Sequence, residues 1–345
     1  MSSDIILSVK KLQINTSSAK DAHAIVDDIS FDVKKGQVTG IVGESGSGKS
    51  ITMLALMGLL SADGASIVTG DITLEEKLLY SADFGMYMPL IRGVKMSMIF
   101  QEPMTSLNPV LTVGSQIASI IEIANTIKGK ENIHKRVIEL LRLVGISDPE
   151  RRFKQYPHEY SGGMRQRAMI AMAIANEPRL LIADEPTTAL DVTVQAQIMR
   201  VLQDVREKTG TAMILVTHDL GLIAENAHDV IVMYGGQIIE HADVSILFDK
   251  PLHPYTVSLL RSIPNVDLKT ERLYSIPGQP PTVEDRPKGC VFQSRCELSR
   301  DRERCIKERP ILKYFTREHS VACHYFDEVD EWIKLIDGQT FGEQR

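Results

Sequence analysis

The stretch Gly43-Glu44-Ser45-Gly46-Ser47-Gly48-Lys49-Ser50 decides the fold of this chain. It fits the pattern G-x-x-x-x-G-K-[ST], in which the glycines let the backbone curl so that successive N–H groups face phosphate oxygens. The apolar run Val38–Val42 before it is expected to form a buried strand, and Ile51–Leu60 after it a helix whose N-terminus adds positive potential. Lys49 is then placed to reach the β- and γ-phosphates, and the Ser50 hydroxyl to bind Mg²⁺. This context favours a nucleoside-triphosphate site over an ordinary glycine-rich turn.

Two later apolar segments end in side chains that suit phosphate chemistry. Arg179–Glu185 ends in two acids, of which Asp184 is expected to hold Mg²⁺ through water and Glu185 to polarise the attacking water. Simple switch GTPases usually lack an acid at that point and position their water with Gln. Ala212–Thr217 is expected to be another buried strand, and His218 follows at its tip, where a histidine can contact the γ-phosphate.

A loop further along the chain completes the set of motifs. It contains Ser161-Gly162-Gly163 and precedes the helical run Ala168–Asn176. Alone, Ser-Gly-Gly is a weak signal because many helices begin in this way. Its position about twenty residues before the Asp-Glu pair strengthens it. In combination, the motifs resemble those of the ATP-binding-cassette (ABC) ATPases over roughly Leu7 to His241.

The resemblance implies a role for each motif. Gly43–Ser50 is the Walker A loop and Ser161-Gly162-Gly163 the signature, both at the nucleotide. Gln101 is the Q-loop glutamine, a candidate for catalysis and for the metal site beside Ser50 and Asp184. Glu185 is the catalytic acid, His218 the switch histidine and Ala189-Leu190-Asp191 the D-loop. The signature reads Tyr-Ser-Gly-Gly-Met rather than the common Leu-Ser-Gly-Gly-Gln, but its phosphate-binding part is intact, so we expect activity.

Besides the signature, the chain departs from the family pattern at the residue that stacks on adenine. An aromatic residue usually precedes the strand that comes before the Walker A strand. Here the segment from Ala19 to Val26 contains no Phe, Tyr or Trp. His23 is the candidate for stacking, and a solvated loop histidine is the alternative.

The hydrophobic pattern agrees with the fold that the resemblance implies, an α/β P-loop NTPase of the ABC type. Ile5, Leu7 and Val9 alternate as in a half-buried strand, which fits an antiparallel β subdomain. Helical spacing without β-type alternation follows Gln101, which predicts a helical subdomain at about residues 103–176. The ATPase domain is expected to span residues 1–250 and a small cysteine-containing C-terminal domain residues 251–345.

The C-terminal third narrows the resemblance to one subfamily. Leu252–Thr256 and Gln101–Pro109 look like the ATPases of bacterial dipeptide and oligopeptide importers, and this likeness extends to about Tyr325. It implies a second ABC ATPase subunit that pairs head to tail, two membrane permease subunits and an external solute-binding protein. Relatives serve nickel or other small solutes, so an importer of that kind is an alternative. A soluble ABC protein without a membrane partner, working in DNA repair or on ribosomes, is another.

All four cysteines, Cys290, Cys296, Cys305 and Cys323, lie in the tail with the spacing C-x5-C-x8-C-x17-C. Disulfides are not expected in a reducing cytosol. Four thiolates from one short segment suit a [4Fe–4S] cluster or a structural Zn²⁺. The spacing lacks the C-x2-C pairs common in zinc sites, and the family resemblance also points to iron–sulfur. Unligated core thiols are the third possibility.

Composition and charge limit the class of protein. The 345 residues are 43% hydrophobic and 24% charged, as in ordinary globular proteins, with a net charge of −6. This acidic balance argues against a nucleic-acid partner. No apolar run reaches the ~18–20 residues of a membrane helix, and the N-terminus has no signal-peptide pattern. We therefore expect a peripheral protein, held by its partners on the cytoplasmic face of the inner membrane.

Overall fold

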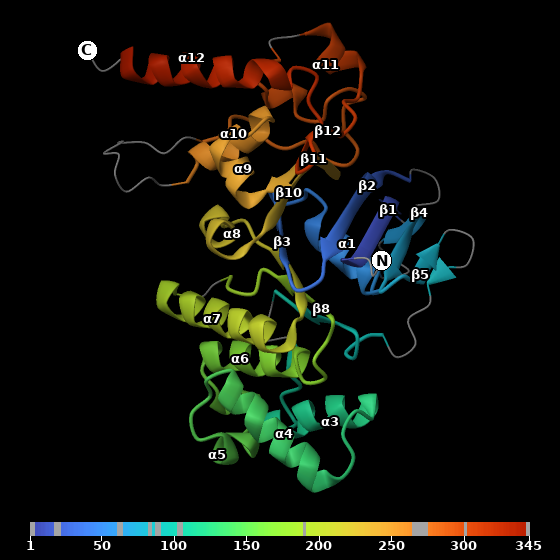
Figure 1. Cartoon of the computed structure of the whole chain (residues 1–345), viewed down its shortest axis with the longest axis vertical. Helices are drawn as coiled ribbons and strands as arrows, with labels where there is room; N and C mark the ends of the chain where they lie inside the picture. The colour runs from blue at the N-terminus through green and yellow to red at the C-terminus, as the bar shows by residue number, and fades with distance from the viewer. Residues whose placement is uncertain are drawn as a thin grey trace.

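In a computed structural model, the chain forms two sheets, a helical subdomain and a C-terminal region (Figure 1). The D-loop residues Ala189 and Leu190 lie outside the described residues. The described ranges are 4–16, 22–60, 65–81, 85–86, 91–101, 106–188, 191–263, 275–299 and 302–342, with side chains up to residue 336.

The first sheet is the antiparallel subdomain that the alternation predicts. Its five strands run in the order β2-β1-β4-β5-β6. On β2 the side chains of Ile29, Phe31 and Val33 are buried and alternate with more exposed neighbours, so one face of the sheet packs against the core. The strands are β1 (Ile5–Thr16), β2 (Ala24–Lys34), β4 (Ala65–Leu74), β5 (Lys77–Ser81) and β6 (Gly85–Met86).

The second sheet has eight strands in the order β12-β13-β11-β10-β3-β9-β8-β7. From β10 to β7 neighbouring strands are parallel, so their carboxyl ends meet at one edge. The three central strands of this parallel part, β3, β9 and β8, are buried at every residue. The bounds are β3 (Val38–Val42), β7 (Met96–Ile99), β8 (Leu180–Asp184), β9 (Ala212–Val216), β10 (Asp229–Tyr234), β11 (Gln237–Asp243), β12 (Lys313–Thr316) and β13 (His319–Val321).

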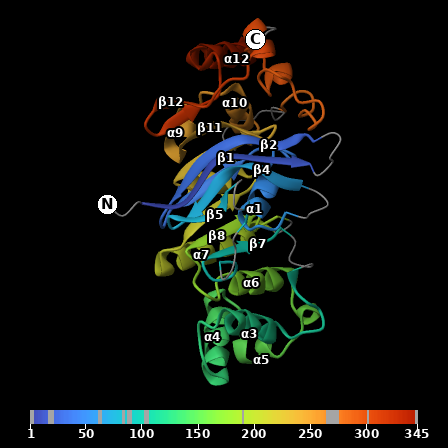
Figure 2. The same ribbon diagram turned by 90° about the vertical axis from the view of Figure 1, so that its right-hand side faces the viewer.

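The helical subdomain lies at one end of the molecule, away from the C-terminal region (Figures 1 and 2). Ile117 and Ile121 of α3 and Val137 and Leu141 of α4 belong to one buried cluster. Between residues 106 and 176 the described elements are all helical, as predicted. They are α3 (Val113–Ala124), α4 (Lys130–Leu143), α5 (Pro149–Phe153), the 3₁₀ turn Pro157–Glu159 and α6 (Gly162–Ala173).

Two predicted helix boundaries were wrong. The helix after the Walker A loop, α1 (Lys49–Leu56), ends four residues before Leu60 because Gly58 adopts φ 61°, the left-handed conformation that closes many helices. Helix α6 begins at Gly162 rather than at Ala168 because the Ser161 side chain caps it. The core helices that follow are α7 (Val192–Thr209), α8 (Leu220–Asn226) and α9 (Val244–Asp249).

The C-terminal region is joined to the core sheet by main-chain hydrogen bonds. Strand β13 pairs with β11, and the Ala322 N–H donates to the Ile239 carbonyl over 2.8 Å. Trp332 packs with Val257 and Leu298 in a small cluster of its own. The domain boundary at residue 250 therefore remains a prediction. The helices here are α10 (Pro254–Arg261), α11 (Glu303–Lys307) and α12 (Val329–Gly342), with 3₁₀ turns at Gln293–Arg295 and Phe326–Glu328.

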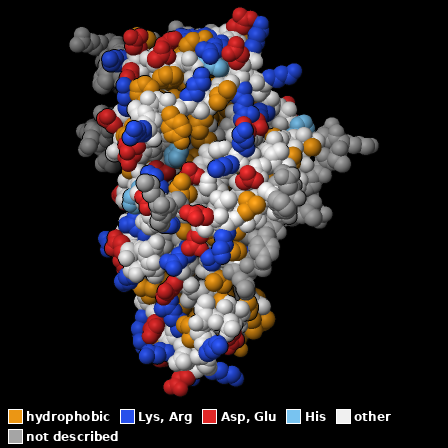
Figure 3. Space-filling model, turned by 45° about the vertical axis from the view of Figure 1, so that its right-hand side comes forward, with side chains coloured by type: hydrophobic (Ala, Val, Ile, Leu, Met, Phe, Trp, Pro, Cys, Tyr) orange, Lys and Arg blue, Asp and Glu red, His pale blue; other side chains and the backbone are white. Residues whose placement is uncertain are grey.

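The surface carries mixed charge. Figure 3 shows Lys and Arg side chains interspersed with Asp and Glu over one face of the molecule. Within the described ranges, none of the helices has both the length and the apolar character of a membrane span.

Candidate functional site

The Walker A loop turns from the end of β3 into α1 around glycines that no other residue can replace cheaply. Gly46 and Gly48 have φ of 78° and 96°. A Cβ on Gly43 would lie 2.1 Å from the Met233 carbonyl oxygen, so the loop passes directly over the neighbouring strand β10. The loop therefore keeps its main chain close to the sheet at the carboxyl edge.

Lys49 is folded back against the loop. Its Nζ donates to the carbonyls of Gly43 at 2.8 Å and Glu44 at 3.0 Å, and to Ser47 Oγ at 3.3 Å. Burial lowers the pKa of this ammonium, while the charges of Glu185, Asp184 and Glu44 act in the opposite direction. The amine is thus desolvated and held by neutral oxygens, which phosphate oxygens can replace.

Ser50 and Asp184 meet across the strand tips. Ser50 Oγ donates to Asp184 Oδ1 over 3.2 Å. Burial raises the pKa of Asp184, the Ser50 hydrogen bond lowers it, and the nearby Glu185 raises it again. A hydroxyl and a buried carboxylate, side by side, are oxygen ligands of the kind that Mg²⁺ takes, so this pair fits the metal that the sequence predicts.

Glu185 is held from three sides. Its backbone has φ 46°, an uncommon conformation for a residue with a side chain. Gln101 Nε2 and Thr188 Oγ1 each donate to Glu185 Oε2 over 2.8 Å. His218 Nδ1 lies 3.5 Å from Oε1. The structure therefore brings the predicted Gln101, Glu185 and His218 together. Thr188 was missed, and its only signal is its position three residues after the acid.

These groups line one cavity of ≈ 370 Å³ at the carboxyl edge of the sheet. Ile25 of β2 also lines this cavity. The adenine-stacking residue is expected just before this strand. His23 is not among the lining residues, and its N–H donates to Thr16 Oγ1 over 3.1 Å. A stacking role for His23 stays a prediction. The lining residues are Ile25, Gly43, Ser45, Gly46, Gly48, Lys49, Ser50, Ile51, Gln101, Glu185 and His218.

The signature lies elsewhere in the chain. Ser161 caps α6 by accepting the Met164 N–H over 3.3 Å, so its helix N-terminus is exposed and ordered. A Cβ on Gly162 would meet nothing within 4 Å. Among the described residues that line the phosphate cavity, none belongs to Ser161-Gly162-Gly163. A single chain therefore does not bring its signature to its own phosphates.

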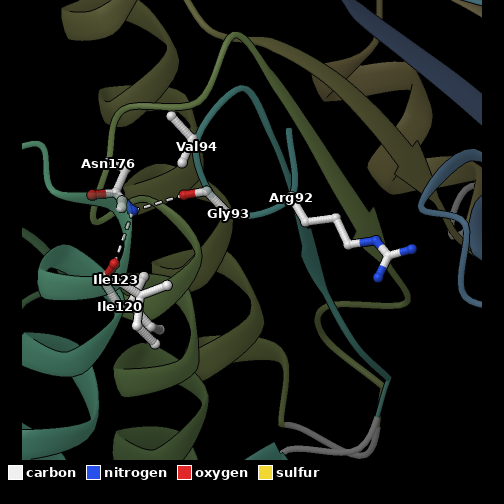
Figure 4. A pocket seen from close by; sticks show the side chains of 7 residues that line it. Arg92, Gly93, Val94, Ile120, Ile123 and Asn176 are labelled. Atoms are coloured by element: carbon white, nitrogen blue, oxygen red, sulfur yellow. Dashed lines mark hydrogen bonds between the residues drawn. The ribbon is translucent and has the colours of Figure 1, made fainter. Parts of the chain in front are cut away.

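A groove lies at the start of β7, at the end of the strand away from Gln101, where the helical subdomain joins the core (Figure 4). Asn176 Nδ2 donates to the carbonyls of Gly93 at 2.8 Å and Ile120 at 3.4 Å. Arg92 points away from these residues and donates to the carbonyls that end α1. Asn176 therefore joins α3 to the turn that precedes β7, the edge strand that leads to Gln101.

The four tail cysteines line a second, narrow cavity together with His253 and Tyr325. Burial raises the pKa of Cys290 to about 12 and that of Cys296 to about 11, and it also raises the pKa of Cys305 and Cys323. In the part of the chain that is described, no group of three or more His, Cys, Asp or Glu side chains is arranged to hold a metal ion. The thiols converge on one cavity but do not form a finished metal site.

Comparison with known sequences identifies two family regions. The model described as ABC transporter matches residues 26–188, and the one described as the oligopeptide/dipeptide transporter C-terminal region matches residues 239–305. The oligopeptide transport ATP-binding protein AppD of Bacillus subtilis is 47% identical over 94% of this chain and 97% of its own length. The dipeptide transport ATP-binding protein DppD of Escherichia coli is 47% identical over 93% and 96%.

Solved structures agree on the fold. A dimeric ATP-binding cassette in a post-hydrolysis state with ADP and phosphate superposes with a TM-score of 0.60 at 26% identity, covering 69% of this chain and 99% of that one. CbiO1 of Clostridium perfringens, part of the ABC transporter complex CbiONQ, gives 0.60 at 27% identity over 72% and 92%.

Proposed function

Because this chain belongs to the family of ABC transporter ATP-binding proteins, we propose that it is the ATP-hydrolysing subunit of a dipeptide or oligopeptide importer. The observation that carries the proposal is a cavity lined by the Walker A loop, Gln101, Glu185 and His218. Its Ser50 is hydrogen-bonded to a second acid, Asp184. The match of residues 239–305 to the oligopeptide/dipeptide transporter region supports the solute class.

The proposed chemistry follows from the contacts around Glu185. Lys49 exchanges its carbonyl partners for phosphate oxygens, and the loop N–H groups bind the same phosphates. Mg²⁺, when bound by Ser50 and through water by Asp184, neutralises phosphate charge. Glu185 accepts the proton of the attacking water, and its orientation is fixed by Gln101 and Thr188. His218 lies beside this acid, and its proposed role is to contact the γ-phosphate.

The second half of the site is proposed to come from another ATPase subunit. Ser161-Gly162-Gly163 opens a helix N-terminus at the surface, which suits the phosphates of a nucleotide held by a different chain. Bound ATP then favours the closed pair, and hydrolysis removes that preference. We propose a homologous but different partner subunit, two membrane permease subunits and an external solute-binding protein, with this chain on the cytoplasmic face of the inner membrane.

The tail cysteines are proposed to hold a [4Fe–4S] cluster, with Zn²⁺ as the alternative. All four thiols line one cavity, and backbone N–H groups of Phe292, Ser299 and Tyr325 face the sulfurs of Cys290, Cys296 and Cys323. Such N–H donors stabilise thiolates around a metal. Iron, sulfide and absorbance measurements on anaerobically purified protein test this proposal, and colourless protein that contains neither iron nor zinc would leave unligated core thiols.

The decisive experiment for the transport function is reconstitution of the co-purified complex in liposomes with its binding protein. We expect peptide-loaded binding protein to stimulate ATP hydrolysis and peptide uptake, and both to disappear in a Lys49→Ala complex. Nickel added with its own binding protein is the matched control for the other importer class. Stimulation by nickel alone would reassign the solute, and a stable complex with ribosomes or DNA instead of permeases would overturn the importer.

A further inference from the structure

The C-terminal region contacts the Walker A loop at Glu44 through an ion pair and a hydrogen bond. Arg295 Nη1 lies 2.7 Å from Glu44 Oε2, and the Glu44 N–H donates to Tyr255 Oη over 2.8 Å. Glu44 occupies a position that the phosphate-loop pattern leaves free, so the pattern itself does not require a carboxylate there. Both partners lie more than 200 residues further along the chain.

Arg295 is built into its surroundings. Its side chain is only 6% exposed, and it also donates to Tyr234 Oη at 3.0 Å and to the carbonyls of Pro277 and Ile276 at 2.8 and 3.3 Å. Its guanidinium lies 5.8 Å from the centroid of the Tyr234 ring, and the rings of Tyr234, Tyr255 and Phe292 pack with one another at centroid distances of 4.6 to 5.3 Å. Glu44 is the anionic partner of this buried guanidinium, so removing either member leaves an uncompensated charge.

These contacts extend to Lys49, the residue proposed to bind phosphate, through the Glu44 main chain. The Glu44 main chain is held at both ends, because its N–H donates to Tyr255 and its carbonyl accepts from Lys49 Nζ at 3.0 Å. A second carbonyl contact, from the Ser47 N–H at 3.2 Å, fixes the turn that follows. The C-terminal region thereby sets where the loop places Lys49. A merely structural anchor would hold the tail without touching these groups.

We propose that Arg295 and Tyr255 are positioning residues for the Walker A loop, through which the C-terminal region sets the affinity of this subunit for ATP. Because linkage is reciprocal, ATP in turn orders the segment that contains Arg295. That segment begins at Cys290 and ends at Cys296, so a displacement of either of these two residues is transmitted to the nucleotide. The inference rests on the proposed ATP binding and adds a route of regulation to it.

Nucleotide affinity of Arg295→Gln tests the proposal directly. We expect a fluorescent ATP analogue to bind about tenfold more weakly, because the Walker A loop loses the charge-assisted bond that fixes Glu44. KM for ATP should rise while kcat at saturation changes little, and Arg295→Lys should restore part of the loss. Arg302→Gln is the matched control, because Arg302 pairs with Glu328 within the tail and away from the loop.

A double-mutant cycle with Glu44→Gln separates positioning from general damage. If the residues act as one pair, the two losses should not add. Should Arg295→Gln fail to fold, Tyr255→Phe keeps the ring, removes only the acceptor of the Glu44 N–H, and is expected to weaken ATP binding in the same direction. Unchanged affinity in the folded variant, additive losses, or an equal effect of Arg302→Gln would overturn the inference.

Hydrogen exchange supplies the reciprocal readout. In wild-type protein and in Arg302→Gln, ATP should increase protection of the main chain at residues 290–296, and in Arg295→Gln it should not. Wild-type protein that binds no ATP would refute the proposed function itself. Wild-type protein that binds ATP without any change in the tail would refute only this inference.

Discussion

The two cavities of this molecule place ionisable groups in opposite ways. At the phosphate cavity the buried ammonium of Lys49, at the start of α1, lies near the carboxylates Asp184 and Glu185 at the end of β8. The tail cavity is lined by four thiols, three of them from irregular segments and Cys305 from α11. Burial disfavours the charged form in both places, lowering the pKa of Lys49 and raising that of Cys290 to about 12.

These opposite arrangements make the two cavities behave differently without a ligand. Opposite charges compensate one another, so the phosphate cavity keeps its polar geometry before any ligand arrives. Four like groups cannot compensate, so the tail cavity is stable only with neutral thiols or around a cation. The first cavity is therefore preformed, whereas a metal in the second must displace protons and draw the sulfurs together.

Removal of the catalytic acid from the preformed cavity should reduce activity more than any other change proposed for this protein. Glu185→Gln should lower ATP turnover by about 10²–10⁴-fold, the range for a lost general base. ATP binding should persist, because Lys49 and the loop N–H groups are untouched, and ATP should hold the subunits in a closed pair. Phosphate release and light scattering with ATP measure the two outcomes.

Glu177→Gln is the control for this change, because Glu177 pairs with Arg136 on the surface of the helical subdomain. It should leave turnover unaltered. If Glu185→Gln also turned over ATP at the normal rate, the cavity would be prepared for binding alone, and the assigned base would have to be abandoned.

An intermediate effect is expected at the signature, which tests whether the preformed cavity is complete. Within its own chain a Cβ on Gly162 would meet nothing within 4 Å, so Gly162→Ala should leave the unfolding free energy equal or slightly higher. Against a nucleotide of a second subunit, an added methyl costs typically about 1–3 kcal/mol. Turnover should therefore fall about tenfold or more.

ATP binding to the isolated subunit is the internal control for Gly162→Ala and should equal that of wild type. A normal rate of turnover would mean that nothing approaches Gly162 during hydrolysis, and the shared site would be refuted.

The two cavities were also unequally predictable from sequence. The phosphate-loop pattern assigned Lys49, and the rule that side chains meet at strand tips assigned Asp184, Glu185 and His218. No local sequence pattern indicated the left-handed backbone of Glu185 or its hydrogen bond with Thr188.

Contacts over long sequence distances were beyond the reach of periodicity. The pairing of β13 with β11 and the ion pair of Arg295 with Glu44 depend on how the tail folds over the sheet. Cysteine spacing indicated a common site and the structure places the four thiols around one cavity, but spacing alone does not fix the distances between sulfurs.

The smallest expected effect concerns the stability of the tail cavity in acid. His253 is 1% exposed, and burial lowers its pKa from 6.5 to about 3. The native state therefore keeps this ring neutral where the unfolded chain protonates it. Its contribution to stability is fully present above pH 6.5 and is lost as the pH falls toward 3. Between pH 7.5 and 4.5 the loss should be on the order of 2–3 kcal/mol.

His253→Asn isolates this contribution. The Nδ1 atom of His253 accepts the Tyr255 N–H over 3.0 Å and caps α10, and Asn is an equally good cap that does not titrate. Trp332, the single tryptophan, packs in the tail and reports its unfolding by fluorescence. Urea titrations at the two pH values should show a smaller acid loss in the variant, whereas equal losses would mean that other tail groups carry the acid sensitivity. In that case the buried neutral His253 would not explain why the tail cavity loses stability in acid.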